Sequence, residues 1–334
     1  MKLFSKLKGW DRIEVLSIIV ILILFALTPV FIRNPFYLNM VVVTILYAYM
    51  SSSWNILGGF AGQLFLGGGV IFFGIGAYTS TVLLVRYNVS PWLGMAAAAL
   101  ICTIVAFFLA KLTLRYSIRG DYLALFSVAL SQALALLITN IAWLGGSFGF
   151  ILPITNDSFV LMTWSGREPF LYLALGMLSL NVILAYTLKN MKIGKYWVAI
   201  RENDVAAEAL GVDTARYKTM AMLLTGALGG MGGTVYALYT TFIDPFLVFG
   251  LPLNFEFILP VLAGGKGTVL GPLLGASILK PLSELVRTYF GQARAGLYLM
   301  IYGALLIIVI IRLPAGVVGA MRQWYDKRAR KNVL

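Results

Sequence analysis

The chain has 334 residues, of which 60% are hydrophobic and only 12% are charged, and it contains no histidine and one cysteine. This composition excludes an intrachain disulfide, a His/Cys metal site and a Cys–His nucleophile. The net charge of +13 would indicate nucleic-acid binding in a soluble protein. Here the cations lie between long apolar runs, as they do in the loops of a membrane protein.

Apolar runs of membrane-spanning length recur from one end of the sequence to the other. The hydrocarbon core of a bilayer is about 30 Å thick, so a helix crosses it in about 20 residues. The pattern predicts an all-α polytopic membrane protein, with some discontinuous helices, that forms a single domain over residues 1–334. About ten spans are expected, near residues 15–33, 39–57, 64–85, 91–110, 121–144, 170–188, 217–240, 250–264, 268–286 and 295–313.

The first apolar run follows a basic stretch and could therefore imitate a secretory signal. The run is long for the apolar region of such a signal, and Arg33-Asn34-Pro35 offers no small-residue cleavage pattern. We therefore expect a first span that is retained in the protein.

The distribution of Lys and Arg predicts which ends of the spans face the cytoplasm. With a cytoplasmic amino terminus, 20 of the 26 cations fall in inside segments, 5 fall in outside segments, and Lys280 falls within a span. The positive-inside rule expects such a bias. Both termini are therefore predicted to be cytoplasmic, as residues 1–14 and a basic tail at 314–334, together with a loop at 189–218.

Two glycine-rich blocks interrupt the apolar pattern, one after the second span and one between the eighth and ninth. Interrupted helices leave backbone groups free, which a membrane tolerates only inside protein or beside a water-filled cavity. The blocks fit either a solute path or close helix packing, and both interpretations stay open. The candidate path residues, glycines together with polar side chains near them or within the spans, are Asn55, Gly59, Gly62, Gln63, Glu256, Gly264 and Gly265.

Charged side chains inside the apolar runs need either a partner or a function. Lys280 and Glu284 lie four residues apart on one helical face and are predicted to form a structural pair. Three roles stay open for Glu256: a path residue, a partner for a Lys or Arg elsewhere, or a residue near the membrane surface.

A helix of about two turns is predicted in the inside loop. Asn203 or Asp204 can cap its start, and Gly211 can end it in a left-handed conformation. Val205, Ala209 and Val212 lie on one apolar face, and Asp204 and Glu208 share an acidic one. A helix this short is not stable alone in water, and its acids and small alanines are unlike those of helices that lie on lipid headgroups. The pattern favours docking to a cytoplasmic partner protein.

Residues 201–212 of this loop read Arg-Glu-Asn-Asp-Val-Ala-Ala-Glu-Ala-Leu-Gly-Val. This segment resembles the ATPase-coupling loop of permeases from branched-chain amino acid ABC importers, and the chain as a whole resembles their LivM type. The resemblance runs in the expected order over residues 40–320. It is carried by residues 54–64, 72–79, 119–124, 201–212, 216–218, 261–272 and 312–316.

The resemblance implies a permease subunit, in a prokaryotic plasma (inner) membrane, of an ATP-driven importer for branched-chain or similar aliphatic amino acids. It implies as partners a LivH-type permease subunit, two ATP-binding-cassette ATPases and an extracytoplasmic substrate-binding protein. The chain has no Gly-x-x-x-x-Gly-Lys-[Ser/Thr] phosphate loop, so we predict no enzyme activity of its own, no cofactor and no metal. The ATPase contact is expected at Arg201, Glu202, Asp204, Val205, Ala206, Ala207, Glu208, Ala209 and Gly211.

Other functions stay open at this point. Related permeases carry urea, short amides or other small solutes, and here Gly68 and Gly69 follow Gly67, where family members often place His, Gln or Asn. A membrane-embedded enzyme such as a lipid-modifying transferase would use clustered Asp, Glu or His, whereas the 13 acids of this chain are scattered. A channel or secondary carrier would not need the helix within residues 199–212.

Overall fold

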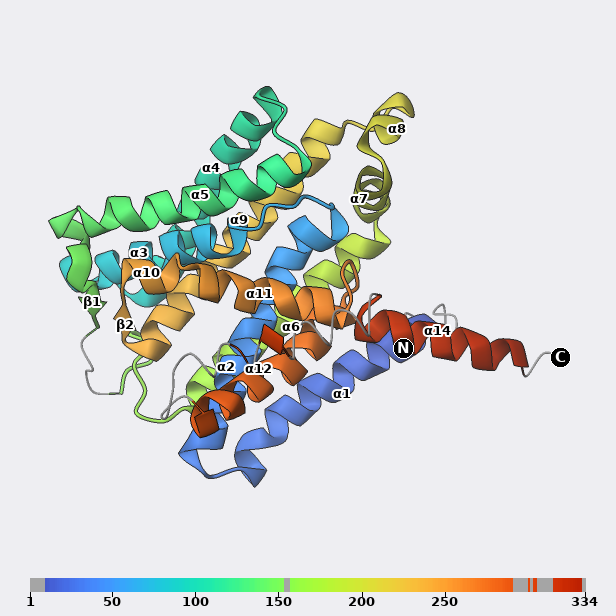
Figure 1. Cartoon of the computed structure of the whole chain (residues 1–334). Coiled ribbons are helices and arrows are strands. Elements are labelled where there is room, and N and C mark those ends of the chain that lie inside the picture. The colour runs from blue at the N-terminus through green and yellow to red at the C-terminus, as the bar shows by residue number, and fades with distance from the viewer. Residues whose placement is uncertain (1–9, 153–156, 291–299, 301–302, 305–314, 332–334) are drawn as a thin grey trace.

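The computed structural model describes residues 10–152, 157–290, 300, 303–304 and 315–331, and these form an assembly of helices (Figure 1). The long helices are α1 (Trp10–Phe31), α2 (Pro35–Trp54), α3 (Gly68–Tyr87), α4 (Pro91–Arg115), α5 (Gly120–Thr139), α6 (Glu168–Asn190), α9 (Thr214–Thr240), α11 (Leu251–Gly264), α12 (Leu270–Phe290) and α14 (Gly316–Lys331). The short elements are the π-helix η2 (Asn55–Phe60), the 3-10 helices η3 (Ala142–Leu144) and η4 (Gly146–Phe148), the strands β1 (Phe150–Ile151) and β2 (Phe242–Ile243), and the helices α7 (Lys192–Glu202), α8 (Asp204–Ala209) and α10 (Pro245–Val248).

The prediction of an all-α polytopic membrane protein is confirmed. Eight segments of the described residues are long and apolar enough to cross a bilayer, and they match the first eight predicted spans. The ninth predicted span is helix α12, which is long enough but carries Lys280, Glu284 and Arg287. The tenth, at 295–313, lies outside the described residues except at positions 300, 303 and 304.

Polar caps and prolines determine where several helices begin. The Asn34 side chain accepts a hydrogen bond from the Phe36 N–H ahead of α2, whose first residue is proline. The Asp213 carboxylate accepts one from the Arg216 N–H at the start of α9. These bonds satisfy N–H groups that lack a partner within the helix, and a proline at the first position has no N–H to satisfy.

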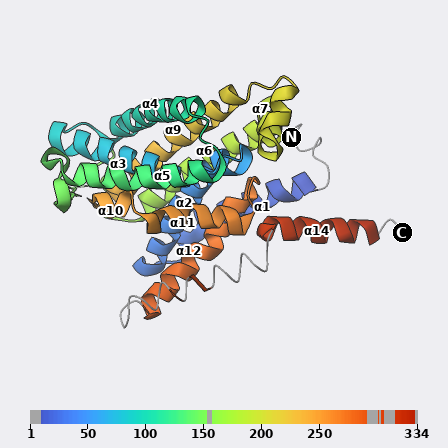
Figure 2. The ribbon, with the colours of Figure 1, turned by 45° about the horizontal axis from the view of Figure 1, so that its top comes forward.

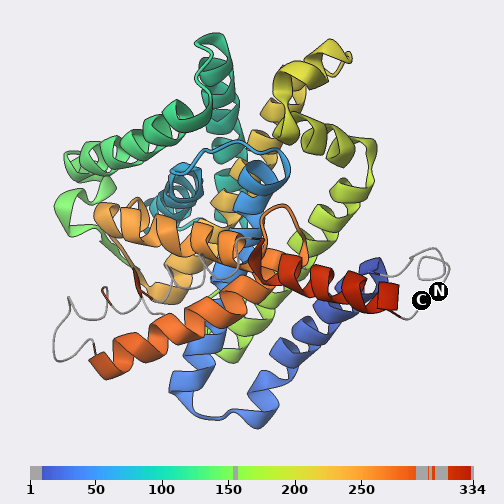
Figure 3. The same ribbon diagram turned by 45° about the vertical axis from the view of Figure 1, so that its right-hand side comes forward.

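Helix α2 lies at the centre of the described structure, where it packs against α6, α9, α11 and α12. In the most apolar stretch of α2 and η2, 83% of the residues are buried, against 11% for α1. Helix α1 lies along the lower edge in Figures 1 and 3 and exposes Leu16, Val20 and Leu24. Such an apolar outer face suits contact with lipid.

Helices α3, α4 and α9 form the most extensively packed group, and they lie side by side in Figure 2. Small residues allow this close approach. A Cβ atom on Gly76 of α3 would overlap the Gly230 carbonyl of α9, and one on Gly230 would lie 2.7 Å from the Ala98 carbonyl oxygen of α4. These glycines therefore serve helix packing.

The two ends of the molecule carry different elements (Figures 1 and 2). At one end, β1 and β2 form an antiparallel ribbon in which Phe150 pairs with Ile243; we call this the ribbon end. The opposite end, which we call the α8 end, carries α7, α8, the start of α1 and α14. The rings of Trp10 and Tyr325 lie 5.8 Å apart there and join α1 to α14.

The loop predicted at 189–218 contains two helices instead of one. Helix α7 precedes α8 and buries Gly194, Trp197 and Ile200, which recur every three residues. The Trp197 indole N–H donates to the Tyr217 carbonyl at 2.9 Å and so fixes α7 to the start of α9. The signal for α7 was present in the sequence as helical periodicity, but its basic and polar residues read as a loop.

Candidate functional site

A cavity of about 730 Å³ lies toward the ribbon end, among α2, α6, α9, α11, α12 and the loop before α6. We call this cavity the chamber. Its wall combines aromatic and aliphatic side chains, among them Tyr47, Phe170, Tyr236 and Leu253, with charged groups of both signs. A concave, mostly apolar site with a few convergent polar groups is typical of small-molecule binding.

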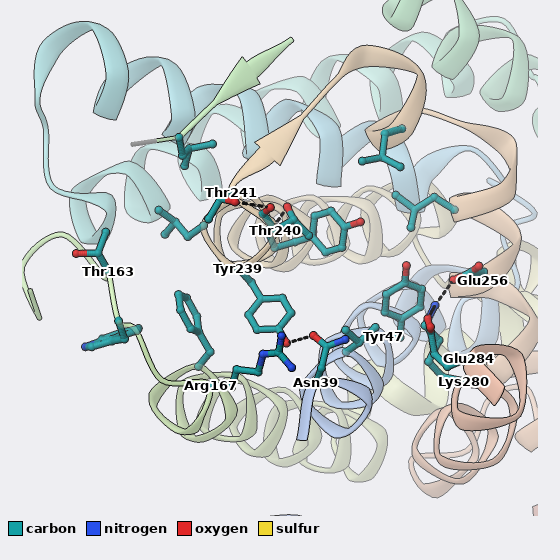
Figure 4. Close-up of a pocket in the computed structure, with 18 of the residues that line it drawn as sticks. Asn39, Tyr47, Thr163, Arg167, Tyr239, Thr240, Thr241, Glu256, Lys280 and Glu284 are labelled. Atoms are coloured by element: carbon teal, nitrogen blue, oxygen red, sulfur yellow. Dashed lines mark hydrogen bonds and ion pairs between the residues drawn. The ribbon is translucent and has the colours of Figure 1, made fainter. Parts of the chain in front are cut away.

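Lys280 lies between two glutamates on one side of the chamber (Figure 4). Its Nζ atom is 2.6 Å from Glu256 Oε2 and 3.1 Å from Glu284 Oε1. It also lies 3.9 Å from the centroid of the Tyr47 ring, in cation–π contact. The predicted Lys280–Glu284 pair is therefore confirmed, and Glu256 both pairs with Lys280 and lines the chamber. The cluster thus brings together one ammonium and two carboxyl groups.

Arg167 lies on the opposite side of the chamber, with Asn39 and Tyr47 between it and Lys280 (Figure 4). One guanidinium N–H donates to the Pro35 carbonyl at the start of α2. Beside it, the Tyr239 hydroxyl donates to Asn39 Oδ1. These bonds join α2, α6 and α9 at the ribbon end, and they place in the chamber wall a cation that is well suited to carboxylates.

The two glycine blocks meet at the α8 end. The Asn55 amide donates to the Thr268 carbonyl at 2.8 Å and accepts from the Gly267 N–H at 3.0 Å. The Gly59 carbonyl accepts from Arg201 Nη1 at 3.2 Å. We call this group of Asn55, Gly59, Arg201, Gly267 and Thr268 the glycine junction. It joins the broken end of α2 to the loop between α11 and α12 and to helix α7.

Glycine is required where Arg201 crosses this junction. Gly62 has a φ of +69°, and a Cβ atom there would lie 2.6 Å from Arg201 Cγ. Gly267 has a φ of +74°, and its Cβ would overlap the Arg201 guanidinium. Both positions combine a left-handed backbone with close contact to a side chain. The sequence could not reveal that Arg201, predicted as a coupling residue, contacts both predicted glycine blocks.

The predicted path residues therefore separate into three groups. Among the described residues, Glu256 lines the chamber, whereas Asn55 and Gly59 belong to the glycine junction, beside Gly264 and Gly265. The remaining two, Gly62 and Gln63, line a second cavity of about 140 Å³ that also contains Asp204. The Gln63 amide donates to the Lys218 carbonyl there at 3.0 Å. A role for these residues in a solute path stays a prediction.

Helix α8 is attached to its neighbours at its first residue, Asp204. The Asp204 carboxylate lies 2.8 Å from Lys218 Nζ and 3.3 Å from Arg119 Nη1. The hydrogen bond from Lys218 lowers the pKa of Asp204 below its ordinary value, and the charges of Lys218 and Arg119 lower it further. The Asn203 side chain caps the helix, and Gly211 follows it with a φ of +85°, as the sequence predicted.

Most of the apolar face predicted for α8 points away from the described part of the protein, whereas Val212, which follows the end of the helix, is half-buried. Val205 is 64% exposed, Leu210 is 85% exposed, and Ala209 is also exposed. Ala207, on another side of the helix, is the buried residue. The described chain thus supplies attachment for α8 through Asp204 and Ala207 and leaves Val205 and Ala209 uncovered.

Glu14 is a buried acid that the sequence interpretation placed in a cytoplasmic terminal segment. It lies in the second turn of α1, is 2% exposed, and pairs with Lys189 at the end of α6 at 2.9 Å. It also accepts a hydrogen bond from the Val269 N–H at 3.3 Å, next to the glycine junction. The only signal in the sequence was an acid at the start of an apolar run.

Comparison with known proteins identifies the family. A family model described as "Branched-chain amino acid transport system / permease component" matches residues 36–310. The chain belongs to this permease family. It is an integral membrane protein with several membrane-spanning helices.

Individual relatives agree with this membership. The chain is 28% identical over 329 residues to the high-affinity branched-chain amino acid transport system permease protein LivM of Salmonella typhimurium. This alignment covers 90% of this chain and 75% of that protein. It is 27% identical to LivM of Escherichia coli, over 84% of this chain and 69% of that one. It is 26% identical to the autoinducer 2 import system permease protein LsrC of Yersinia pseudotuberculosis, over 81% and 76%. No solved structure matches.

Proposed function

We propose that this protein is the membrane-spanning permease subunit of an ATP-driven importer of branched-chain or similar aliphatic amino acids. The observation that carries the proposal is the chamber, whose aromatic and aliphatic wall also holds charged groups of both signs. The chain belongs to a family of permeases, so such a chamber is suited to a transported solute. A free aliphatic amino acid has an ammonium, a carboxylate and an apolar side chain. Glu256 and Arg167 offer partners of opposite charge, and Tyr236 and Leu253 offer apolar contact.

The ATPase of this importer docks on α8. The chain contains no phosphate loop for ATP, so ATP hydrolysis belongs to separate subunits. The exposed Val205 and Ala209 supply an apolar face for a groove in the ATPase. In this arrangement the α8 end and both termini are cytoplasmic. A LivH-type permease completes the path, and an extracytoplasmic binding protein delivers solute to the ribbon end.

Arg201 connects α7 and α8 mechanically to the membrane helices. It is the penultimate residue of α7, three residues before the start of α8, and its guanidinium contacts Gly59 at the broken end of α2. A displacement of α7 and α8 by the ATPases therefore acts directly on the glycine junction. Alternating access follows when this displacement changes which end of the path is open.

The similarity to LsrC, an autoinducer 2 import permease by name, supports a second candidate, a solute that is not an amino acid, and the uncharged molecules urea and short amides are its first probes. Such an uncharged solute has no carboxylate for Arg167 and no ammonium for Glu256. Replacing Arg167 with Gln would then leave uptake largely unchanged, whereas amino-acid uptake would fall.

The test is uptake by the assembled transporter in proteoliposomes, with its permease partner, ATPases and binding protein. We expect ATP-dependent accumulation of radiolabelled leucine, isoleucine or valine, and a permease subunit that co-purifies with the ATPases. Uptake of urea without leucine would support the second candidate. Leucine uptake that needs no ATP, or a permease that never brings down an ATPase, would contradict the proposed mechanism.

A further inference from the structure

Asn254 of α11 is a buried amide without a hydrogen-bond partner in the structure. The residue is 1% exposed, and neither Oδ1 nor Nδ2 has a partner. The buried Asn55 uses both ends of its amide, whereas Asn181 donates to the Tyr49 carbonyl and to Ser53 Oγ but leaves its Oδ1 without a partner. A buried polar group left unsatisfied costs about 1–3 kcal/mol. A leucine at position 254 would avoid this cost, so the amide is a candidate for binding a polar group of the solute.

The Asn254 side chain faces a niche beside Gly69, the second residue of α3. A Cβ atom on Gly69 would lie 3.6 Å from Asn254 Oδ1, 3.5 Å from Phe257 Cδ2 and 3.7 Å from Trp54 Cδ1. Side chains from α2 and α11 thus converge on a position where α3 presents none. These are ordinary van der Waals distances, so packing does not require glycine at position 69. We call the group of Trp54, Gly69, Asn254 and Phe257 the Asn254 niche.

The niche lies between the chamber and the glycine junction. On one side, the Phe257 ring contacts the ring of the chamber residue Tyr47, with centroids 5.3 Å apart. On the other side, Trp54 is followed directly by Asn55, which holds the glycine junction together. Neither Asn254 nor Phe257 lines the chamber, although Phe257 contacts Tyr47, which does.

We propose that the Asn254 niche is a closed segment of the solute path and that Asn254 binds the polar head of an α-amino acid during its passage. The inference rests on the proposed function. The amide oxygen accepts from an ammonium group, and the amide N–H donates to a carboxylate. The amide that has no partner in the closed niche gains one when solute enters. An interaction made only during passage raises the maximal rate and leaves capture of solute unchanged.

The first test is Asn254→Leu in the complete transporter, reconstituted in proteoliposomes with leucine as the probe. We expect the maximal uptake rate per assembled complex to fall at least about tenfold, as for loss of a hydrogen bond to a charged group. The KM should stay close to that of the wild type. The midpoint of thermal unfolding should stay equal or rise, because an unsatisfied amide has been removed. Asn181→Leu is the matched control and should lower the midpoint, because Asn181 makes two hydrogen bonds.

Gly69→Ala is a second variant that does not disturb Asn254 itself. The added methyl fits at van der Waals distance but occupies the open position of the niche. We expect slower uptake with normal assembly. Gly76→Ala is its control and should impair assembly, because its Cβ overlaps the Gly230 carbonyl.

The outcomes separate this inference from the proposed function. Normal uptake rates in both Asn254→Leu and Gly69→Ala would overturn the niche and leave the importer intact. A lower unfolding midpoint in Asn254→Leu with a normal rate per complex would show a purely structural amide. If Asn254→Leu fails to assemble, the uptake rate of Gly69→Ala decides whether the niche takes part in transport. A wild-type complex that assembles but imports no aliphatic amino acid contradicts the proposed function, and the inference with it.

Discussion

Lys280 is the residue on which the ion pairs of the chamber depend, because both Glu256 and Glu284 use it as their partner. Lys280→Met should therefore lower the midpoint of thermal unfolding of the purified permease markedly. Removing one member of a buried ion pair typically costs about 3–5 kcal/mol, since the remaining charge is left uncompensated. The matched control is Glu284→Gln, which keeps the Lys280–Glu256 contact and should cost less. An unchanged midpoint in Lys280→Met would show that the carboxylates are solvated without it.

Asp204 makes the attachment of α8 dependent on pH. Lys218 and Arg119 hold the pKa of Asp204 below its ordinary value. The ionised carboxylate therefore stabilises α8 fully above the ordinary carboxyl pKa of about 3.9, and this contribution is lost as the pH falls through the lowered pKa of the folded protein. We expect amide hydrogen exchange in α8, corrected for intrinsic rates, to accelerate over that acidic range. Asp204→Asn should give fast exchange with no such pH step, and a step that persists in this variant would assign it to another group.

Helix caps and ion pairs within one helical turn could be predicted from the sequence, whereas long-range contacts could not. Asn203 and Gly211 marked the ends of α8 because capping depends on the chain within a few residues. Lys280 and Glu284 could be paired because they lie one helical turn apart. Glu256 lies 24 residues from Lys280, and Glu14 lies 175 residues from Lys189. No periodicity connects such positions, and only the fold brings them together.

Among the elements, α8 gives the most direct test, because the ATPase is proposed to bind its uncovered apolar face. Ala209→Asp places a charge on the uncovered apolar face and should abolish both uptake and co-purification with the ATPases. The amount of permease in the membrane should not change, because Ala209 is exposed. Asn190→Asp adds the same charge at the α8 end but off this helix, on another exposed position, and should retain uptake. Normal uptake in Ala209→Asp would contradict the proposal that the ATPase docks on α8.

The sequence predicted long apolar helices well because bilayer thickness and composition set their length. It did not predict the β1–β2 ribbon, whose strands of two residues each are too short for a period-2 pattern. It predicted a break after the second span from the glycines, but not that the break is a π-helix that leads into a contact with Arg201. Tertiary contacts decide the shape of such irregular segments, and the same holds for the position of the chamber.

At the scale of the whole molecule, the two ends should lie on opposite sides of the membrane. In a Cys102→Ala background, Ala206→Cys at the α8 end and Phe148→Cys near the ribbon provide exposed single thiols. A membrane-impermeant maleimide added to intact cells should label position 148 and should label position 206 only after lysis. Labelling of position 206 in intact cells would reverse the topology and exclude an ATPase on α8.

The single carboxylate of Glu14 also has a consequence for biosynthesis. Helix α1 is translated before the other described helices, and Lys189 and Val269 follow Glu14 by 175 and 255 residues. Before that, α1 has neither of these partners, and few of its side chains are buried even in the finished protein. The contacts of Glu14 can therefore form only after α6 and the start of α12 have been made, so the final position of α1 depends on segments that are synthesised much later.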